Sequence, residues 1–259
     1  MEVDHWEALA SDWAEHNPQV LWRAHSDAVN LRLLQRWLPR SGVRRILKTD
    51  LFDEAFGNGL MPPLVAAASG VYGIDVSTGV VAAAGRREPR LRGVRSDVRR
   101  LPFADGAFDV VVSISTLDHF RERSDIDGSL AEIHRTLRLG GRLILTLDNA
   151  LNPVVALRNA IPFSPLRRVG LVPYFVGATY GPRGLSEALS ATGFRLLART
   201  ATLHCPRVLA VPLASLVHKR GGDRGRARLA RFLLGFERCV RLPTRYVTGH
   251  FVAVLAEKA

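Results

Sequence analysis

Residues 95–120 read RSDVRRLPFADGAFDVVVSISTLDHF, and they enclose one apolar segment between turn residues. The stretch FDVVVSIS (108–115) is dense in β-branched residues, which is typical of a strand that is buried on both faces. Asp97 precedes this segment and His119 follows it, so polar side chains stand at both of its ends. A strand of this kind needs helices on each side of its sheet, which favours an α/β fold.

Strand-like and helix-like segments alternate on both sides of this stretch. Residues 124–138 carry apolar side chains at helical spacing, and we expect Gly140-Gly141 to stop that helix before a strand at 142–148. Further strands are expected at 43–52, 71–75, 93–96, 194–202 and 250–258, and further helices at 59–69, 76–87 and 183–193. This alternation predicts a parallel sheet covered by helices on both faces. Such sheets bind ligands at the carboxyl ends of their strands.

Acidic residues follow the first three predicted strands in order. Asp50 or Asp53 follows the first strand, Asp75 ends the second, and Asp97 follows the third. A carboxylate at the end of the second strand, after a glycine turn at the first, can accept hydrogen bonds from a ribose diol. The alternative is that Asp75 only caps the helix that follows it.

The run 95–120, together with EIHRTLRLGGRLILTLDN (132–149), closely resembles the class I S-adenosylmethionine-dependent methyltransferases. More narrowly, it resembles the small-molecule group called type 11. The pattern consists of an acid after strand three, LPF, FD opening strand four, a histidine near its end and a GG turn before strand five. Here these elements are Asp97, Leu101-Pro102-Phe103, Phe108-Asp109, His119 and Leu139-Gly140-Gly141. The resemblance implies a Rossmann-like seven-stranded sheet and S-adenosylmethionine as the cofactor.

The loop after the first strand, LFDEAFGNG (51–59), departs from the family's pattern of an acid followed by three spaced glycines. In one register Asp53 takes the acid position, Ala55 replaces the first glycine, and Gly57 and Gly59 are the other two. Alanine can replace a glycine where the backbone keeps a negative φ. In this register we expect the two remaining glycines to let the backbone approach the cofactor.

A second register remains open for the same loop. It places Lys48 at the acid position and leaves a longer loop that contains Asp50, Asp53 and Glu54. In either register a carboxylate stays near the expected ammonium group of the methionine moiety. We therefore predict an altered loop that still binds the cofactor.

The resemblance assigns roles residue by residue. The residues that it places around the cofactor are Asp50, Asp53, Gly57, Gly59, Asp75, Val76, Asp97, Val98 and Ser113. Asp53 or Asp50 would orient the methionine amino group, and Asp75 would bind the ribose hydroxyls. Val76 would pack on the adenine, whose edge Asp97 and the Val98 amide would recognise. Ser113 would lie beside the sulfonium, and His119 is the candidate general base, with a structural role as the alternative.

Three segments exceed the cofactor-binding core at 43–148: an N-terminal helical cap (1–42) and two inserts (149–182 and 203–245). If strands five and six run parallel, both inserts leave from the carboxyl edge and cover the same opening. They combine apolar or aromatic residues with arginines: Phe163, Leu171, Val172, Tyr174, Phe175, Tyr180, Arg158, Arg167, Arg168 and Arg207. Loops on a rigid scaffold carry specificity, so this content predicts a small, lipophilic or anionic substrate.

The segment 224–241 has the pattern of an amphipathic helix. Its apolar stripe is Leu229, Phe232, Leu233, Phe236 and Val240, and its basic side is Arg224, Arg228, Arg231 and Arg238. Such a helix is suited to peripheral contact with an anionic membrane. The alternative is a helix that packs its apolar stripe on its own domain.

The 259 residues carry a net charge of +12, which arginine dominates, because lysine occurs only at Lys48, Lys219 and Lys258. The excess is typical of a GC-rich coding genome, or of a basic surface that meets an anionic partner. The basic residues are dispersed, so we expect no specific nucleic-acid binding. An RNA methyltransferase and a catalytically silent S-adenosylmethionine-binding protein remain the alternative functions.

The length of the chain and its two cysteines indicate how many domains and which cellular compartment to expect. A chain of 28.5 kDa with 47% hydrophobic residues can bury a core as one domain, 1–259. Cys205 and Cys239 form no CxxC pair, which favours a reduced, cytoplasmic protein, and no cluster of metal ligands is visible.

Overall fold

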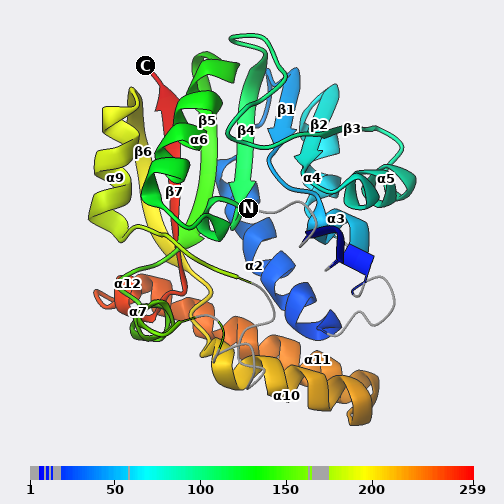
Figure 1. Ribbon diagram of the computed structural model, residues 1–259. Helices are drawn as coiled ribbons and strands as arrows, with labels where there is room; N and C mark the ends of the chain where they lie inside the picture. Colours follow the sequence, from blue (N-terminus) through cyan, green and yellow to red (C-terminus); the bar gives the residue numbers. More distant parts are fainter. Residues whose placement is uncertain are drawn as a thin grey trace.

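A computed structural model of the chain describes residues 6–8, 10–11, 13, 19–57, 59–162, 164 and 175–259 (Figure 1). Several residues expected in the substrate cap therefore lie outside the described residues: Phe163, Arg167, Arg168, Leu171, Val172 and Tyr174. Helices and strands keep the labels of Figure 1.

The described chain builds a seven-stranded sheet in the order β3-β2-β1-β4-β5-β7-β6. The strands are β1 (Arg45–Lys48), β2 (Gly70–Asp75), β3 (Leu91–Arg95), β4 (Phe108–Ile114), β5 (Leu137–Asp148), β6 (Phe194–Thr202) and β7 (Phe251–Lys258). Strands β1 to β6 share one direction, whereas β7 is antiparallel to β5 and β6. The expectation of a wholly parallel sheet is wrong in this strand. The chain leaves β6 at its carboxyl end and re-enters the sheet from the same end, so β7 has to run in reverse.

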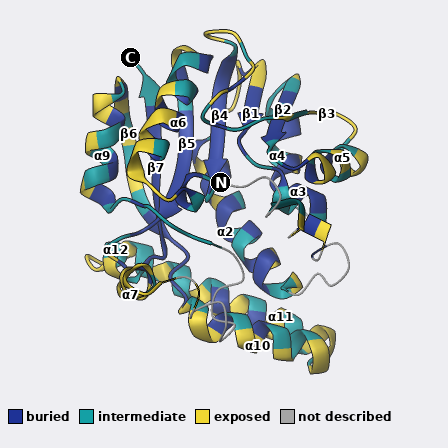
Figure 2. Ribbon diagram, in the orientation of Figure 1, coloured by how far each residue is buried: buried dark blue, intermediate teal, exposed yellow. Residues whose placement is uncertain are grey.

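Neighbouring residues on a strand point to opposite faces of the sheet, and each face has its own apolar core. In β1, Ile46 belongs to one core and Leu47 to the other. The first core is covered by α2 (Val20–Trp37), α3 (Phe52–Phe56), α4 (Met61–Ala67) and α5 (Thr78–Arg87), and the second by α6 (Arg123–Thr136) and α9 (Pro182–Ala191). Figure 2 shows the central strands as buried along their length. This arrangement confirms the predicted seven-stranded α/β sheet with helices on both faces.

Two predicted boundaries are wrong, each for a local reason. The first strand ends at Lys48 rather than at residue 52, because Phe52–Phe56 forms the short helix α3. Helix α6 ends at Thr136, and Gly140 and Gly141 lie inside β5. There Gly140 has a φ of 69°, and the pairing with β4 shifts register. The two glycines therefore form an irregularity within a strand and not a helix stop.

A third apolar core lies beyond the carboxyl ends of the parallel strands. It joins Trp22 and Val29 of α2 to the helices of the segment 203–245 and to Phe251. The helices of this segment are α10 (Arg207–Arg220), α11 (Gly222–Gly235), η2 (Phe236–Arg241) and α12 (Arg245–Thr248), and the other insert contains α7 (Pro153–Ala160). Figure 1 shows these helices gathered at one end of the molecule. Both inserts thus start at the carboxyl edge, as expected from parallel β5 and β6.

Candidate active site

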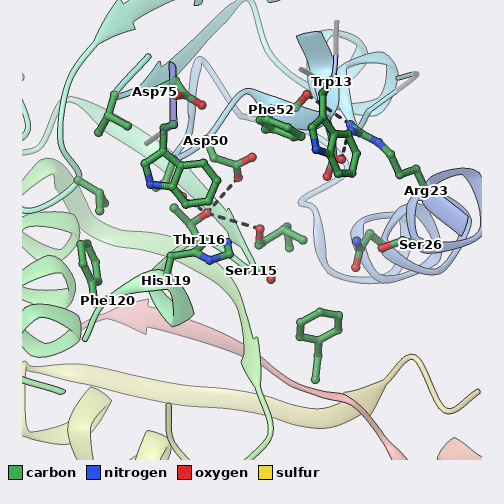
Figure 3. Close-up of a pocket in the computed structure, with 18 of the residues that line it drawn as sticks. Trp13, Arg23, Ser26, Asp50, Phe52, Asp75, Ser115, Thr116, His119 and Phe120 are labelled. Atoms are coloured by element: carbon green, nitrogen blue, oxygen red, sulfur yellow. Dashed lines mark hydrogen bonds and ion pairs between the residues drawn. The ribbon is translucent and has the colours of Figure 1, made fainter. Parts of the chain in front are cut away.

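A cavity of about 160 Å³ lies at the carboxyl ends of the central strands, where the strand order reverses between β1 and β4 (Figure 3). Seven of the residues predicted from the sequence line it: Asp50, Asp53, Asp75, Val76, Asp97, Val98 and His119. Gly57, Gly59 and Ser113 are not among its lining residues. The walls come from the sheet edge, from α2, from the N-terminal segment and from the start of α10, so residues far apart in sequence meet here.

Asp75 ends β2 and presents a buried carboxylate to the cavity. Its Oδ2 accepts a hydrogen bond from the Leu51 amide (3.1 Å), and its Oδ1 accepts one from the Ser77 amide (2.9 Å). Burial raises the pKa of Asp75 to about 6, although both amide hydrogen bonds act in the opposite direction. A carboxylate has about four acceptor positions, so Asp75 can accept further hydrogen bonds from a ligand diol.

Asp97 follows β3 at the same end of the cavity. Its carboxylate accepts three hydrogen bonds from the Arg99 guanidinium, which also contacts Asp125. Burial acts to raise the pKa of Asp97, but these hydrogen bonds hold it below its ordinary value. The apolar side chains of Val76 and Val98 complete this part of the wall. This part of the wall, here called the apolar slot, thus consists of two valine side chains beside the carboxylate of Asp97.

The loop after β1 adopts the second of the two registers, with Lys48 at the strand end. The Lys48 side chain is 1% exposed, and its Nζ lies 2.8 Å from Glu54 Oε2 and 3.2 Å from Asp50 Oδ2. It also donates to the Asp50 carbonyl oxygen (2.8 Å). Burial acts to lower the pKa of Lys48, but the carboxylates of Asp50 and Glu54 raise it overall. A buried cation thus stands where the family's pattern has an acid.

The two glycines of this loop serve its fold. Glu54 Oε1 accepts a hydrogen bond from the Leu60 amide (2.8 Å). Gly59 has a φ of 56°, and a Cβ added there would lie 2.6 Å from Glu54 Oε1. A Cβ added at Gly57 would lie 3.1 Å from the Asp53 carbonyl oxygen. Gly59 therefore leaves room for a buried carboxylate, and neither glycine borders the cavity.

Arg23 of α2 is a site residue that the sequence reasoning missed. Its NH2 donates to Asp53 Oδ1 (2.6 Å), and its guanidinium carbon lies 5.0 Å from the Trp13 ring centroid and 5.3 Å from that of Phe52. Its Nε and NH1 are buried and have no hydrogen-bond partner among the described residues. Figure 3 shows Arg23 on the far side of the cavity from Asp75. Arg23, Asp27 and Asn30 recur at helical spacing on a buried face, which was the available signal.

Carboxylates outnumber cations at this end of the cavity. Arg23, Asp50 and Asp53 line the cavity, and Asp27, Lys48 and Glu54 are buried beside them. Burial and then the charges of Asp53 and Glu54 raise the pKa of Asp27 to about 7. Because the acids repel one another, a cationic ligand placed here would be stabilised by them.

The residues after β4 that line the cavity come later in the chain than Ser113. Ser113 is fully buried and accepts a hydrogen bond from Thr49 Oγ1 (2.9 Å). Ser115 and Thr116 line the cavity instead, and Thr116 Oγ1 donates to Asp50 Oδ2 (3.0 Å). Ser115 has a φ of 50°, unusual for a residue other than glycine. Ser115 Oγ donates to Oδ2 of the buried Asp118 (3.0 Å), so an acidic side chain holds each of the two hydroxyl groups of this turn.

His119 lies on η1 (Leu117–His119) directly after this turn. Its Nδ1 is 3.0 Å from the Phe175 carbonyl oxygen, and its ring packs edge-on against Trp6. A carbonyl oxygen only accepts, so Nδ1 carries the hydrogen, and the neutral ring has its lone pair on Nε2. With Nδ1 as the donor, Nε2 is the ring atom that would accept a proton, and it lies 4.0 Å from Oδ1 of the buried Asp118.

The remaining wall contains large apolar side chains and also Gln19, Ser26, Asn30 and one arginine. Trp22, Leu203 and Phe251 line it together with Arg207, whose NH1 lies 3.4 Å from His250 Nε2. His250 in turn lies 3.3 Å from Asp148 Oδ1, at the end of β5. This wall suits a lipophilic molecule with a polar or negative group.

The N-terminal segment closes the cavity beside Asp75. Glu7 Oε1 accepts from the Thr78 amide (2.7 Å), and Glu7 Oε2 accepts from Ser77 Oγ (2.8 Å). A carboxylate at the start of α5 is stabilised by the partial positive charge of the helix N-terminus. These contacts hold the neighbouring Trp6 ring over the cavity.

Comparisons with known proteins agree on one family. Residues 52–145 match the family model described as "Methyltransferase domain". A demethylmenaquinone methyltransferase of Beutenbergia cavernae is 36% identical over 138 residues, which are 53% of this chain and 51% of that protein. A "Probable S-adenosylmethionine-dependent methyltransferase" of Mycolicibacterium smegmatis is 26% identical over 211 residues, 81% of this chain and 71% of that protein. The crystal structure of a SAM-dependent methyltransferase of Thermotoga maritima shares the fold over 100% of both chains, with a TM-score of 0.63 at 15% identity.

This chain carries a methyltransferase domain over residues 52–145, and it is similar to S-adenosylmethionine-dependent methyltransferases in sequence and in fold. The predicted family, its Rossmann-like sheet and S-adenosylmethionine as the cofactor of the family are thereby confirmed. The chain spans about half the length of the Beutenbergia cavernae relative, 51%. Within the described part of this methyltransferase, no three His, Cys, Asp or Glu side chains are arranged to hold a metal ion.

Proposed function

We propose that this methyltransferase transfers the methyl group of S-adenosylmethionine to an oxygen, nitrogen or carbon atom of a small acceptor that is lipophilic or anionic. The observation that carries the proposal is the division of one cavity into two chemically different ends. Strand-end carboxylates line one end, and Trp22, Leu203, Phe251 and Arg207 line the other. A methyl donor and a lipophilic acceptor need two such ends in a single cavity.

The residues at the carboxylate end fit the cofactor. Asp75 would accept hydrogen bonds from the ribose hydroxyls, and Val76 and Val98 would enclose the adenine. Asp97 lies at the edge of that slot. These roles are the ones that the sequence pattern predicts for these residues.

At the methionine end, the groups that fit the cofactor are charged side chains and not the expected glycines. Arg23 has two buried nitrogens without hydrogen-bond partners among the described residues, and they suit a carboxylate. Asp50 and Asp53 lie in a region where acids outnumber cations, which suits an ammonium and a sulfonium group. The altered loop thus offers the charges that the methionine moiety requires, without a glycine-rich turn against the cavity.

Bound S-adenosylmethionine supplies a methyl carbon that is already activated by the sulfonium. The chain's own task is then to orient the acceptor, exclude water and take up a proton. Trp6, Trp13 and Phe52 provide the water-excluding walls. His119 Nε2 holds the lone pair that would accept a proton from the acceptor's hydroxyl or amino group.

The name of one relative indicates which acceptor to test first. The Beutenbergia cavernae protein is named for a demethylmenaquinone, and a quinone with a lipophilic tail fits the apolar end of the cavity. We therefore choose a demethylmenaquinone with a short side chain as the first acceptor, and a lipophilic carboxylic acid with a free hydroxyl as the second.

The test has two stages that separate binding from turnover. Mass spectrometry of the denatured, purified protein should detect S-adenosylmethionine or S-adenosylhomocysteine carried through purification. S-adenosylhomocysteine should then form only when an acceptor is added. His119→Asn should retain cofactor binding and lower turnover by roughly 10²–10⁴-fold, whereas His218→Asn, on α10 outside the cavity lining, serves as the matched control.

Each contrary result has a defined meaning. Cofactor binding without turnover on any acceptor would favour the catalytically silent binder, for which the altered loop is the supporting observation. Full turnover in His119→Asn would remove the general base from the proposal and leave orientation as the chain's contribution.

A further inference from the structure

The outer face of α10 is apolar over three turns. Val208, Leu209, Leu213 and Leu216 are 46%, 72%, 40% and 49% exposed, and Pro212 is also exposed between them. The buried side of the same helix is formed by Ala210 and Ala214, which pack in the third core. Four large apolar side chains of α10 are therefore exposed to solvent, whereas Ala210, Ala214 and the partly buried Val211 and Val217 pack inward. An ordinary surface helix keeps its large apolar side chains on the inward face.

Helix α7 repeats this arrangement at the same end of the molecule. Val154 and Leu157 of α7 are 41% and 64% exposed, and Leu151 and Ile161, which flank the helix, are 56% and 37% exposed. Figure 1 places α7 and α10 at the same end of the molecule, beyond the carboxyl ends of the parallel strands. Two helices from different inserts thus expose leucine-rich faces at one end, whereas scattered single apolar residues are the norm on a protein surface.

The charge of the same region is strongly positive. Residues 206–248 contain ten arginine and lysine residues but only two acids, Asp223 and Glu237. Arg224, Arg228 and Arg231 are exposed at helical spacing on α11, which packs beside α10. Lys219 and Arg220 follow directly after the apolar face of α10 and are also exposed. Much of the chain's basic excess therefore borders the apolar faces.

We infer that α7, α10 and α11 form a surface that docks on an anionic lipid bilayer, with the leucines inserted at the interface and the arginines on the headgroups. Leucines on one face and cations beside it are the pattern of interfacial helices. Each basic residue near an anionic bilayer adds to the attraction, and long arginine side chains reach the headgroups while their stems lie on apolar surface. Among the described helices, none is long and apolar enough to cross a membrane.

The sequence predicted a membrane contact through the segment 224–241. In the structure, the exposed apolar side chains lie mainly on α10 and α7 instead. In the segment 224–241, Leu229 and Leu233 are buried against α2 and α10, so most of that apolar stripe packs on the domain itself. Phe232 remains 60% exposed. α11 therefore supplies the cations, and α10 and α7 supply the apolar contact.

Docking in this orientation places the cavity next to the lipid. Arg207 opens α10 and also lines the cavity, one residue before the exposed Val208. If the proposed lipophilic acceptor is correct, it could pass from the bilayer to the cavity along the start of α10. This consequence rests on the proposed function, whereas the docking surface itself does not.

Co-sedimentation of the full chain with vesicles tests the surface without cofactor or acceptor. We expect binding to vesicles of phosphatidylglycerol and phosphatidylcholine, and much weaker binding to phosphatidylcholine alone. Leu209→Asp should weaken binding about tenfold, because a charge replaces an inserted side chain. Leu139 is the matched control: it is also 72% exposed but lies at the opposite, amino end of β5, so Leu139→Asp should bind like the parent.

The contribution of the basic residues to vesicle binding is tested with a second variant and its own control. Replacing Arg224, Arg228 and Arg231 together by glutamine should weaken binding to the anionic vesicles by more than about tenfold, since each cation contributes separately. Replacing the exposed Arg36, Arg40 and Arg44, before β1 at the amino edge, removes the same charge and should have little effect. Unchanged thermal midpoints would show that all four variants fold.

Three results would overturn the inference. The first is an absence of binding to anionic vesicles at low salt, and the second is equal loss in the variants and their controls, which would show only general attraction of a basic protein. The third is a dimer in light scattering that Leu209→Asp dissociates, because the face would then be covered by a second copy of the chain.

Discussion

The two ends of the cavity are built from different structural elements, although both are proposed to bind the same cofactor. The end proposed for the adenosine is built from Asp75 and Asp97, which lie at or after the ends of neighbouring parallel strands. The end proposed for the methionine moiety rests on two ion pairs, Lys48 of β1 with Glu54 of α3, and Arg23 of α2 with Asp53. Under the proposed binding mode, the site keeps the charges that the cofactor requires while losing the glycine-rich turn. This difference also predicts that changes at the methionine end disturb the fold, whereas changes at the adenosine end disturb binding.

The largest effect is expected from Lys48→Met. The substitution leaves Glu54, whose side chain is 2% exposed, without its cation and should lower the free energy of unfolding by about 3–5 kcal/mol. Urea denaturation followed by circular dichroism measures this. Lys48→Met combined with Glu54→Met removes both charges and should recover much of the loss. A single substitution that lowers the free energy of unfolding by less than about 1 kcal/mol would show that the network does not hold the loop.

The second prediction concerns the adenosine end. Asp75→Ala should raise the Kd for S-adenosylmethionine about 10- to 100-fold, because hydrogen bonds to a charged group contribute about 1.5–3 kcal/mol. Its effect on the free energy of unfolding should be smaller than that of Lys48→Met. Calorimetric titration measures the affinity, with Asp105→Ala as a control on an 81% exposed carboxylate outside the cavity lining. Unchanged affinity in a folded Asp75→Ala variant would remove Asp75 from the ribose.

The third prediction tests whether Gly59 is kept for the buried carboxylate. Gly59→Ala brings a Cβ to 2.6 Å from Glu54 Oε1 at a φ of 56°. Gly222 has nearly the same φ, 55°, and nothing within 4 Å of an added Cβ, so Gly222→Ala reports the backbone strain alone. Both variants should be destabilised by about 1–2 kcal/mol for the left-handed conformation, and Gly59→Ala by about 1–3 kcal/mol more for the crowding. Equal losses would mean that Glu54 moves aside freely.

The sequence predicted the parts of this molecule that local patterns control. Alternation of apolar segments located the seven strands, and the acids at strand ends located Asp75 and Asp97 at the cavity. It did not distinguish the two registers of the loop, because Lys48 and Glu54 become partners only after α3 folds back under β1. The expected contact of Gly57 with the cofactor depended on the other register, and the structure places Gly57 away from the cavity.

Arg23 and the reversal of β7 show the other limit of sequence reasoning. Arg23 reaches Asp53 across 30 positions of the chain, and no spacing rule connects the two. The direction of β7 depends on where the helices after β6 return the chain, which the apolar pattern of residues 250–258 does not encode. Contacts between distant segments decide both features.

The smallest expected effect is the dependence of cofactor affinity on pH. One carboxylate near each end of the cavity contributes to it. Burial raises the pKa of Asp75 to about 6 and that of Asp27 to about 7. Both carboxylates favour the ligand when ionised, so affinity should fall as the pH drops through 7 and then 6. The decrease should be a few-fold for each group, less than the tenfold per pH unit that a strictly required ionisation would give.

Two ligands and two variants separate these sources. Asp75 would contact the ribose, which S-adenosylmethionine and S-adenosylhomocysteine share, so Asp75→Asn should remove the decrease near pH 6 for both ligands. Asp27 acts through charge, and S-adenosylhomocysteine lacks the sulfonium, so Asp27→Asn should flatten the decrease near pH 7 mainly for S-adenosylmethionine. Calorimetric titrations between pH 5 and 8, values bracketing both pKa values, provide the measurement. Identical pH profiles for the two ligands in the parent protein would mean that the acids of the methionine end do not sense the sulfonium, and the proposed orientation of the cofactor would have to be reversed.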